Sequence, residues 1–139
     1  MSEQDDKFPV TNKQAAVEID GIHTEILLTE FTDRLLVVIT QYGKIGSLLH
    51  TTIDVPPHLA NNPAAVPTTT NVLFGESAGP QSDLYMLYAT SITQAIVAMN
   101  PREQRPILLG IALKPQEDMK QKRQVFDKVV DQLMALCSA

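Results

Sequence analysis

The chain has 139 residues, of which 44% are hydrophobic and 19% charged, and this is typical of one globular domain. Its net charge of −5 at pH 7 argues against non-specific binding to nucleic acid or to an anionic membrane surface, since both need clustered lysine and arginine. A single cysteine, Cys137, excludes a disulfide within the chain and indicates a reducing compartment.

The beginning of the chain is polar and acidic. Residues Met1 to Asp6 are the opposite of a secretory or transit peptide, and no apolar run approaches the roughly 20 residues that span a bilayer. We therefore expect a protein of the cytoplasm, or of cytoplasm and nucleus. Residues 1–14 are predicted to be a partly disordered tail in which Phe8-Pro9-Val10 docks as a short extended segment, and residues 15–139 a single domain.

A hairpin is predicted at the start of the domain. Residues 15–19 alternate apolar and polar side chains, as a half-buried strand does. Asp20-Gly21 follows at once and is one of the strongest signals for a two-residue hairpin turn. Residues 22–31 then form the return strand.

The next stretch predicts the centre of a sheet. Residues 35–39 are apolar at successive positions, so both faces of this strand are apolar, which predicts a central strand covered on both sides. Gly43 and Gly46 supply turn or bulge geometry, and a fourth strand follows over 45–53. With the hairpin, these strands form a predicted antiparallel meander of four.

A long loop follows the meander. Residues 54–70 are rich in proline, asparagine and threonine, and proline disrupts both helices and strand ladders. A loop of this length in a compact domain is usually functional or disordered. We predict that it is flexible, and two interpretations stay open: a tolerated insertion, or an adaptable loop that contacts a partner.

The second half of the chain alternates strands and helices. Strands are predicted at 70–75 and 107–113, a helix at 83–100 capped by Ser82 or a neighbour, and a last helix with Pro115 in its first position. The apolar and small residues of the first helix that fall on one predicted face are Leu84, Leu87, Tyr88, Ser91, Ile92, Ala95, Ile96 and Met99. The stripe predicted for the last helix is Met119, Phe126, Val129, Val130, Leu133 and Cys137.

This element order predicts an α+β fold, an antiparallel-rich six-stranded sheet (a meander of four strands, then β-α-β-α) with flanking helices. Two helices cannot easily cover both faces of six strands. Some apolar surface should therefore remain for a partner, which is a common reason for dimerisation.

The sequence holds no recognisable set of catalytic or metal-binding residues. The turn around Lys44 lacks the glycine spacing and the following helix of a phosphate-binding loop, and no Gly-x-Ser-x-Gly elbow occurs. His23, His50 and His58 are not paired at the spacing of metal ligands, and Cys137 reads as a small apolar helix residue. We predict a protein that is not an enzyme and has no cofactor and no metal.

One string of residues points to a family. Residues 36–48, with their Thr-Gln-Tyr-Gly-Lys-Ile-Gly core, closely resemble the signature of the proteasome assembly chaperone 3 family. The blocks at 21–24, 72–75 and 107–114 agree with that family in order. Phe8-Pro9-Val10, followed by a lysine, is similar to the plant-type members. The resemblance covers about residues 8–130, with gaps.

The resemblance implies a non-enzymatic chaperone. Such proteins form a homodimer, or a heterodimer with proteasome assembly chaperone 4, and help arrange proteasome α subunits into the seven-membered α-ring. The chain departs from the family in the long loop at 54–70 and in the segment 76–81, which lacks the expected acidic-proline turn. The residues predicted to contact a partner are Gln41, Lys44, His58, Leu59, Asn61 and Asn62.

A different function would fit the same order of elements. Profilin-like and longin-like domains also combine such a sheet with helices, and they serve as scaffolds or adaptors of other complexes. The identity of the bound partners separates the two interpretations. An enzyme with an unrecognised site would instead show a cleft that gathers titratable side chains.

Overall fold

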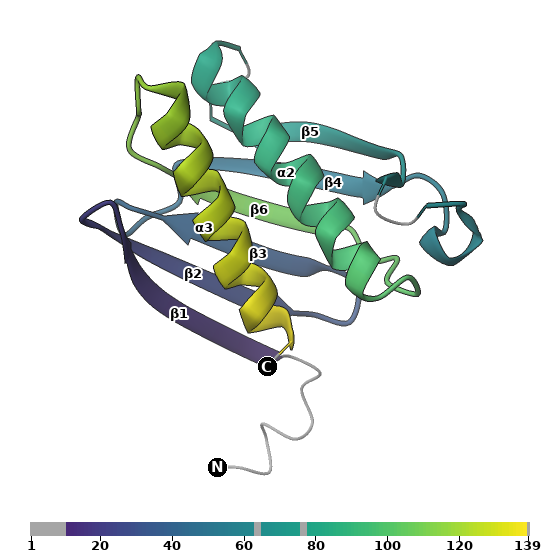
Figure 1. Ribbon diagram of the computed structural model, residues 1–139. Coiled ribbons are helices and arrows are strands. Elements are labelled where there is room, and N and C mark those ends of the chain that lie inside the picture. Colours follow the sequence, from purple (N-terminus) through teal and green to yellow (C-terminus); the bar gives the residue numbers. More distant parts are fainter. Residues whose placement is uncertain (1–10, 63–64, 76–77, 139) are drawn as a thin grey trace, which may run out of the picture.

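A computed structural model describes residues 11–62, 65–75 and 78–138 and shows an α+β fold, as predicted (Figure 1). Most of the predicted tail, including Phe8-Pro9-Val10, lies outside the described residues. Two helices pack side by side on one face of a six-stranded sheet. The elements are β1 (Thr11–Ile19), β2 (Ile22–Glu30), β3 (Leu35–Thr40), β4 (Ser47–Ile53), a 3₁₀ turn η1 (Pro57–Leu59), β5 (Thr68–Phe74), α2 (Pro80–Met99), β6 (Ile107–Ala112) and α3 (Met119–Ser138).

The predicted hairpin is present, and its first strand is longer than expected. β1 begins at Thr11, four residues before the predicted start, and pairs with β2 along its whole length. Asp20 and Gly21 both have positive φ angles, 53° and 77°. Two consecutive residues with positive φ make the turn whose twist matches that of the flanking strands, and Asp and Gly tolerate this conformation best.

The sheet is not the simple meander of four strands that the sequence predicted. Its strand order is β1-β2-β3-β6-β4-β5, so the meander ends after β3. β6 inserts between β3 and β4, parallel to the first and antiparallel to the second. The sheet is therefore mixed but mostly antiparallel. The insertion puts the two most apolar strands, β3 and β6, at the centre of the sheet.

The helices cover only one face of these central strands. Leu35, Val37 and Ile39 point toward the helices and are buried, whereas Leu36 and Val38 on the other face are half-buried. The prediction of a central strand was correct, but the prediction that both sides would be covered was wrong within a single chain. Both helices lie on the same side of the sheet (Figure 1).

Helix α2 begins earlier than predicted, and only part of its predicted face packs on the sheet: Tyr88, Ile92 and Ile96 are buried as expected. Its N-cap is Gly79 with Pro80 in the first helical turn, and Ser82, the predicted cap, is a buried residue inside the helix. Leu87 and Met99 of the predicted face are largely exposed. The buried residues of α2 are Ser82, Tyr85, Tyr88, Ala89, Ile92, Thr93, Ile96 and Val97.

Helix α3 starts four residues after Pro115. The Asp118 carboxylate accepts a hydrogen bond from the Lys120 N–H at 3.0 Å, which is the role of an N-cap. Val129 and Leu133 of the predicted stripe are fully buried. Met119, the first residue of that stripe, is instead mostly exposed. It precedes the part of the helix that packs on the sheet.

Candidate protein-binding site

The residues predicted to contact a partner fall into two separate groups. Gln41 and Lys44 belong to the turn between β3 and β4, whereas His58, Leu59, Asn61 and Asn62 follow the far end of β4. β4 has seven residues, so it separates the groups by about 20 Å. Figure 1 shows the turn and the η1 loop at opposite ends of the sheet. The structure therefore does not bring these residues together into one site.

Gln41 is not a surface residue, although the sequence predicted a contact there. Only 8% of it is exposed. Its side-chain NH₂ donates to the Thr24 hydroxyl at 3.1 Å, and its side-chain oxygen accepts from the Lys114 N–H at 2.8 Å. Its own backbone N–H donates to the Ala112 carbonyl at 2.8 Å. Gln41 thus joins β2, β3 and the end of β6, and its role is structural.

Lys44 lies on the exposed tip of the same turn. The Thr40 hydroxyl organises this turn, because it accepts from the N–H groups of Tyr42 and Lys44 at 3.1 and 3.2 Å and donates to the Lys44 carbonyl at 2.7 Å. Gly43 has a positive φ of 73°, which a side chain would disfavour. The prediction that the glycine-containing string is a tight turn is confirmed, and Lys44 is presented to solvent.

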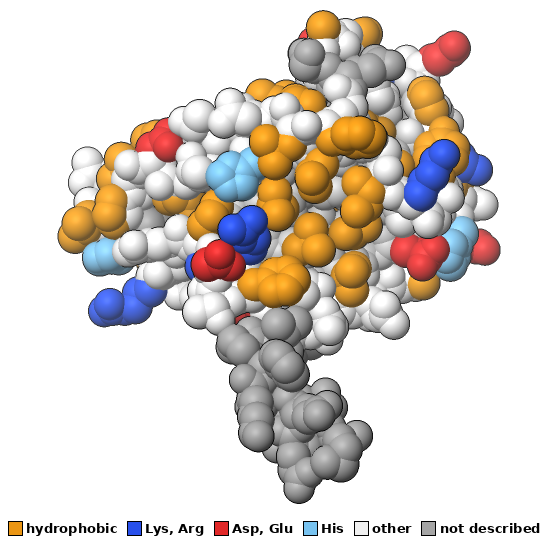
Figure 2. Space-filling view, turned by 180° about the vertical axis from the view of Figure 1, so that it is seen from behind, with side chains coloured by type: hydrophobic (Ala, Val, Ile, Leu, Met, Phe, Trp, Pro, Cys, Tyr) orange, Lys and Arg blue, Asp and Glu red, His pale blue; other side chains and the backbone are white. Residues whose placement is uncertain are grey.

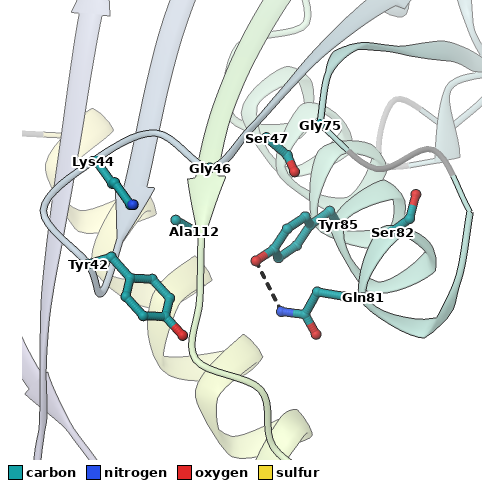
Figure 3. A pocket seen from close by; sticks show the side chains of 9 residues that line it. All are labelled: Tyr42, Lys44, Gly46, Ser47, Gly75, Gln81, Ser82, Tyr85 and Ala112. Atoms are coloured by element: carbon teal, nitrogen blue, oxygen red, sulfur yellow. Dashed lines mark hydrogen bonds between the residues drawn. The ribbon is translucent and has the colours of Figure 1, made fainter.

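A pocket of about 420 Å³ lies beside this turn (Figure 3). Tyr42 and Lys44 line one side, and Gln81 and Tyr85 of α2 line the other. The Tyr85 hydroxyl accepts from Gln81 Nε2 at 3.0 Å and from the Leu113 N–H at 2.9 Å, so it is held by the end of β6. Among the residues that the structure describes, none that lines the pocket is a carboxylate, a histidine or a cysteine.

The second predicted group lies on an exposed loop with one buried anchor. Leu59 of η1 is 71% exposed, and Asn61 and His58 are exposed as well. Val66, further along, is fully buried, and its carbonyl accepts from Gln94 Nε2 of α2 at 3.2 Å. The loop is therefore fixed to the core near its end. The flexibility of the part before this anchor stays a prediction.

The face of the sheet without helices carries a cluster of apolar side chains, which Figure 2 shows gathered near its centre. Register places Leu27, Val38, Gly110, Leu48 and Phe74 in one row across five strands. We name six of the large apolar residues of this face the open sheet face. They are Leu27, Leu36, Val38, Ile45, Leu48 and Leu108.

Gly110, in the middle of this face, leaves room for the Ile45 side chain. A Cβ atom placed on Gly110 would approach three side-chain atoms of Ile45 at 3.0–3.2 Å, so the Ile45 side chain lies over the glycine backbone. Ile45 comes from the same turn as Lys44 and is 46% exposed. The turn thus contributes an apolar residue to the open sheet face. The sequence predicted spare apolar surface but not which residues form it.

An ion-pair cluster at the other end of the sheet is structural. Arg105 makes two bonds to the Glu103 carboxylate, at 2.7 and 2.8 Å, and reaches Glu30 of β2 at 3.1 Å. Its Nη1 also donates to the Phe31 carbonyl at 2.8 Å. The Arg105 hydrogen bonds hold the pKa of Glu103 below its usual value, and the Glu103 bonds raise the pKa of Arg105. This cluster fixes the approach to β6 against the end of β2.

Other candidates for chemistry are not supported. In the ranges that the structure describes, no three side chains of His, Cys, Asp or Glu gather in a way that would hold a metal ion. Among those same residues, no helix is both long and apolar enough to cross a membrane. Burial raises the pKa of the Cys137 thiol, which disfavours a reactive thiolate.

Comparison with known proteins gives consistent results. The family model described as proteasome assembly chaperone 3 matches residues 37–134. A protein of that name from Nematostella vectensis is 35% identical over 114 residues, covering 79% of this chain and 79% of the relative. The Homo sapiens protein of that name is 30% identical over 119 residues, covering 84% of this chain and 90% of the relative.

A solved structure shares the fold. It belongs to a chaperone complex for yeast 20S proteasome assembly and superposes with a TM-score of 0.57. The alignment covers 87% of this chain and 97% of the other, at 13% sequence identity. At this identity the likeness shows the fold alone.

Proposed function

Because the chain belongs to the proteasome assembly chaperone 3 family, we propose that it promotes assembly of the 20S proteasome α-ring by binding α subunits, as one half of a dimer and without catalysis. The observation that carries the proposal is the family match over residues 37–134, which includes both central strands and the turn between β3 and β4.

The open sheet face supports dimerisation. Leu36 and Leu108 are neighbours in register on β3 and β6, and both are only half-buried in the single chain. Burial of such a face against a second sheet removes apolar surface from water, at about 25 cal/mol per Å² before the cost of association. The second sheet belongs to another copy of this chain or to a partner of the proteasome assembly chaperone 4 type.

Aspartate in place of Val38 tests the dimer. A charge at the centre of an apolar interface costs about 2–4 kcal/mol of association free energy, which weakens the dimer roughly 30- to 1,000-fold. Sedimentation equilibrium measures the dimer constant, alone and with the candidate heterodimer partner. Met99→Asp is the matched control, because Met99 is an exposed apolar residue on the helix side. A dimer that tolerates Val38→Asp as well as Met99→Asp would show that the open sheet face is not the interface.

We further propose that α subunits contact the two exposed groups, Lys44 on the turn and Leu59 with Asn61 on the loop. They lie at opposite ends of β4, so together they span enough length to touch a large partner at two points. Mixing the chain with individual α subunits, with and without the heterodimer partner, tests the function by co-migration. The function is wrong if no α subunit co-migrates under either condition. In that case the scaffold or adaptor interpretation applies.

Double substitution Leu59→Ser with Asn61→Ala, compared with Lys44→Ala, tests the two contacts separately. All three residues are exposed, so these changes should alter the free energy of unfolding by less than about 0.5 kcal/mol. Loss of binding is then a direct effect on the contact. If α-subunit binding survives all three changes together, the proteasome subunit is held by another surface.

A further inference from the structure

The outer side of the helix layer carries a groove that the proposed function does not use. It lies between α2 and α3 and has a volume of about 300 Å³. Leu87 from α2 and Met119 from α3 line it, and they are 54% and 74% exposed. The helices lie on the face of the sheet opposite the open sheet face (Figures 1 and 2). A dimer formed through the open sheet face would therefore leave this groove accessible.

The apolar lining of the groove is held in place by the core. Phe126 of α3 packs against the fully buried Tyr88 of α2, with ring centroids 4.7 Å apart and planes inclined at 57°. Leu84 lines the groove one helical turn before Tyr88. Leu84, Leu87, Met119 and Phe126 thus offer apolar surface from two helices whose separation is fixed by packing. Such a groove accepts large apolar side chains without rearrangement of the backbone.

The border of the groove is basic in a chain that is acidic as a whole. Lys122 and Arg123 line it, and with Lys120 they account for three of the 11 Lys and Arg residues within four positions. Asp127 is an acidic residue in the same lining. None of the three basic side chains has a hydrogen bond or ion pair to any part of the chain that the structure describes. Their charges are available to a partner.

These charges also stand where a helix disfavours them. Lys120 and Lys122 lie in the first turn of α3, which contains no acidic residue, and positive side chains there oppose the helix dipole. The Asp118 cap offsets part of this cost. A cluster that costs helix stability and has no partner within the described chain is better explained by recognition than by folding.

We propose that the groove between α2 and α3 binds an acidic segment of a partner protein, which inserts large apolar side chains among Leu87, Met119 and Phe126 while its carboxylates face Lys122 and Arg123. Charge complementarity selects this occupant. Nucleic acid is disfavoured, since the chain carries a net charge of −5. The site is independent of the proposed dimer face, so failure of one does not affect the other.

A synthetic peptide tests the proposal. The probe is a fluorescein-labelled amphipathic helix of about 14 residues, roughly four turns, with Leu on one face and Glu elsewhere. Fluorescence anisotropy with the full chain measures its binding. One control peptide has the same residues in an order without an apolar face, and another replaces every Glu with Lys. We expect only the acidic amphipathic peptide to bind. Equal binding of the scrambled peptide would overturn the proposal, as would no binding at all.

Paired variants of the chain locate the site. Lys122→Glu with Arg123→Glu should weaken peptide binding by about tenfold or more, whereas Lys44→Glu with Arg102→Glu, the same charge change at two exposed residues outside the groove, should weaken it by less than about threefold. Leu87→Ser should weaken it similarly without a change of charge. If both double variants weaken peptide binding equally, net charge alone explains the effect, and the proposal is wrong.

Stability and mass complete the test. Because acidic residues are favourable near the start of a helix, the double variant Lys122→Glu with Arg123→Glu should melt no lower than the wild type. Binding and helix stability then change in opposite directions, which a structural role of Lys122 and Arg123 would not produce. If that variant changes the sedimentation mass of the chain without any peptide, the occupant is a second copy, and the proposal of an acidic partner is wrong.

Discussion

Alanine at Gln41 removes a side chain that links the ends of three strands. Two hydrogen bonds are lost, to the Thr24 hydroxyl at 3.1 Å and from the Lys114 N–H at 2.8 Å. Thr24 is fully buried and keeps its bond to the Ile22 carbonyl. A buried hydrogen bond contributes about 0.5–1.5 kcal/mol net, and an unpaired buried donor costs about 1–3 kcal/mol. We therefore expect Gln41→Ala to lower the free energy of unfolding by about 2–3 kcal/mol.

Urea denaturation followed by circular dichroism measures this loss, and a thermal melt should show a decrease of about 10 °C for a domain of this size. Lys44→Ala is the control three residues away, where exposure predicts a change below about 0.5 kcal/mol. The opposite result would be informative. If Gln41→Ala keeps its stability but loses partner binding, Gln41 acts at the surface, and our description of its buried role is wrong.

Three further changes test other parts of the fold. Gly75→Ala should lower the free energy of unfolding by more than about 2 kcal/mol, because the φ of Gly75 is +102° and the new Cβ would meet a serine oxygen at 2.5 Å. Gly21→Ala, in open space at φ +77°, should lower it by about 1 kcal/mol. The urea midpoints of the two variants test this difference. Val66→Ala should cost about 2–3 kcal/mol in the same assay, and an unchanged midpoint would contradict its burial. Arg105→Ala should destabilise by about 2–4 kcal/mol at neutral pH, because it leaves the buried Glu103 carboxylate unpaired. The pKa of Glu103 is held below 4.5 in the folded state, so the stability that this carboxylate contributes is present above pH 4.5 and is lost as the pH falls. The difference in unfolding free energy between wild type and Arg105→Ala should therefore shrink in acid. A constant difference from pH 7 to pH 3 would refute the pairing.

Local patterns of the sequence were sufficient to predict most elements. The alternation in 15–19 and the Asp20-Gly21 turn identified the hairpin, because strand period and turn chemistry are local properties. The apolar runs of β3 and β6 were both predicted to be central, and they are neighbours. Their pairing was not predictable, because two strands that are apolar on both faces fit beside several others equally well. The insertion of β6 depends on packing of the helices, not on any local signal.

The face of α2 was predicted only in part, for a related reason. Small and apolar residues occur almost all round this helix, so more than one stripe fits helical spacing. The predicted face runs through Leu84 and Leu87, whereas the stripe through Tyr85 and Ala89 packs on the sheet. The tyrosine hydroxyl reaches the Leu113 N–H at 2.9 Å, and this long-range bond favours the observed rotation. No sequence window contains that bond.

Only some of the residues predicted to contact a partner lie at the surface. Lys44 and Leu59 are exposed as a contact requires, but Gln41 is buried because a residue that follows a strand can pair with the neighbouring strand instead of facing solvent. The loop was predicted as a unit over 54–70, yet β5 already begins at Thr68 and Val66 belongs to the core. Deletion of the whole loop would therefore remove core contacts. Only its exposed part can be altered without loss of stability.

The position of β6 has a consequence for how the chain folds. β3 and β4 are close in sequence, but each needs β6, which lies about 70 residues after β3, as its neighbour. During synthesis the segment up to residue 53 has emerged long before residue 112, and domains complete their pairing only when all strands are present. Until then β3 and β4 expose unpaired edges, or pair wrongly with each other as an ordinary hairpin would. We expect folding to be slow for a domain of this size, and chain fragments that end before Ile107 to aggregate rather than fold.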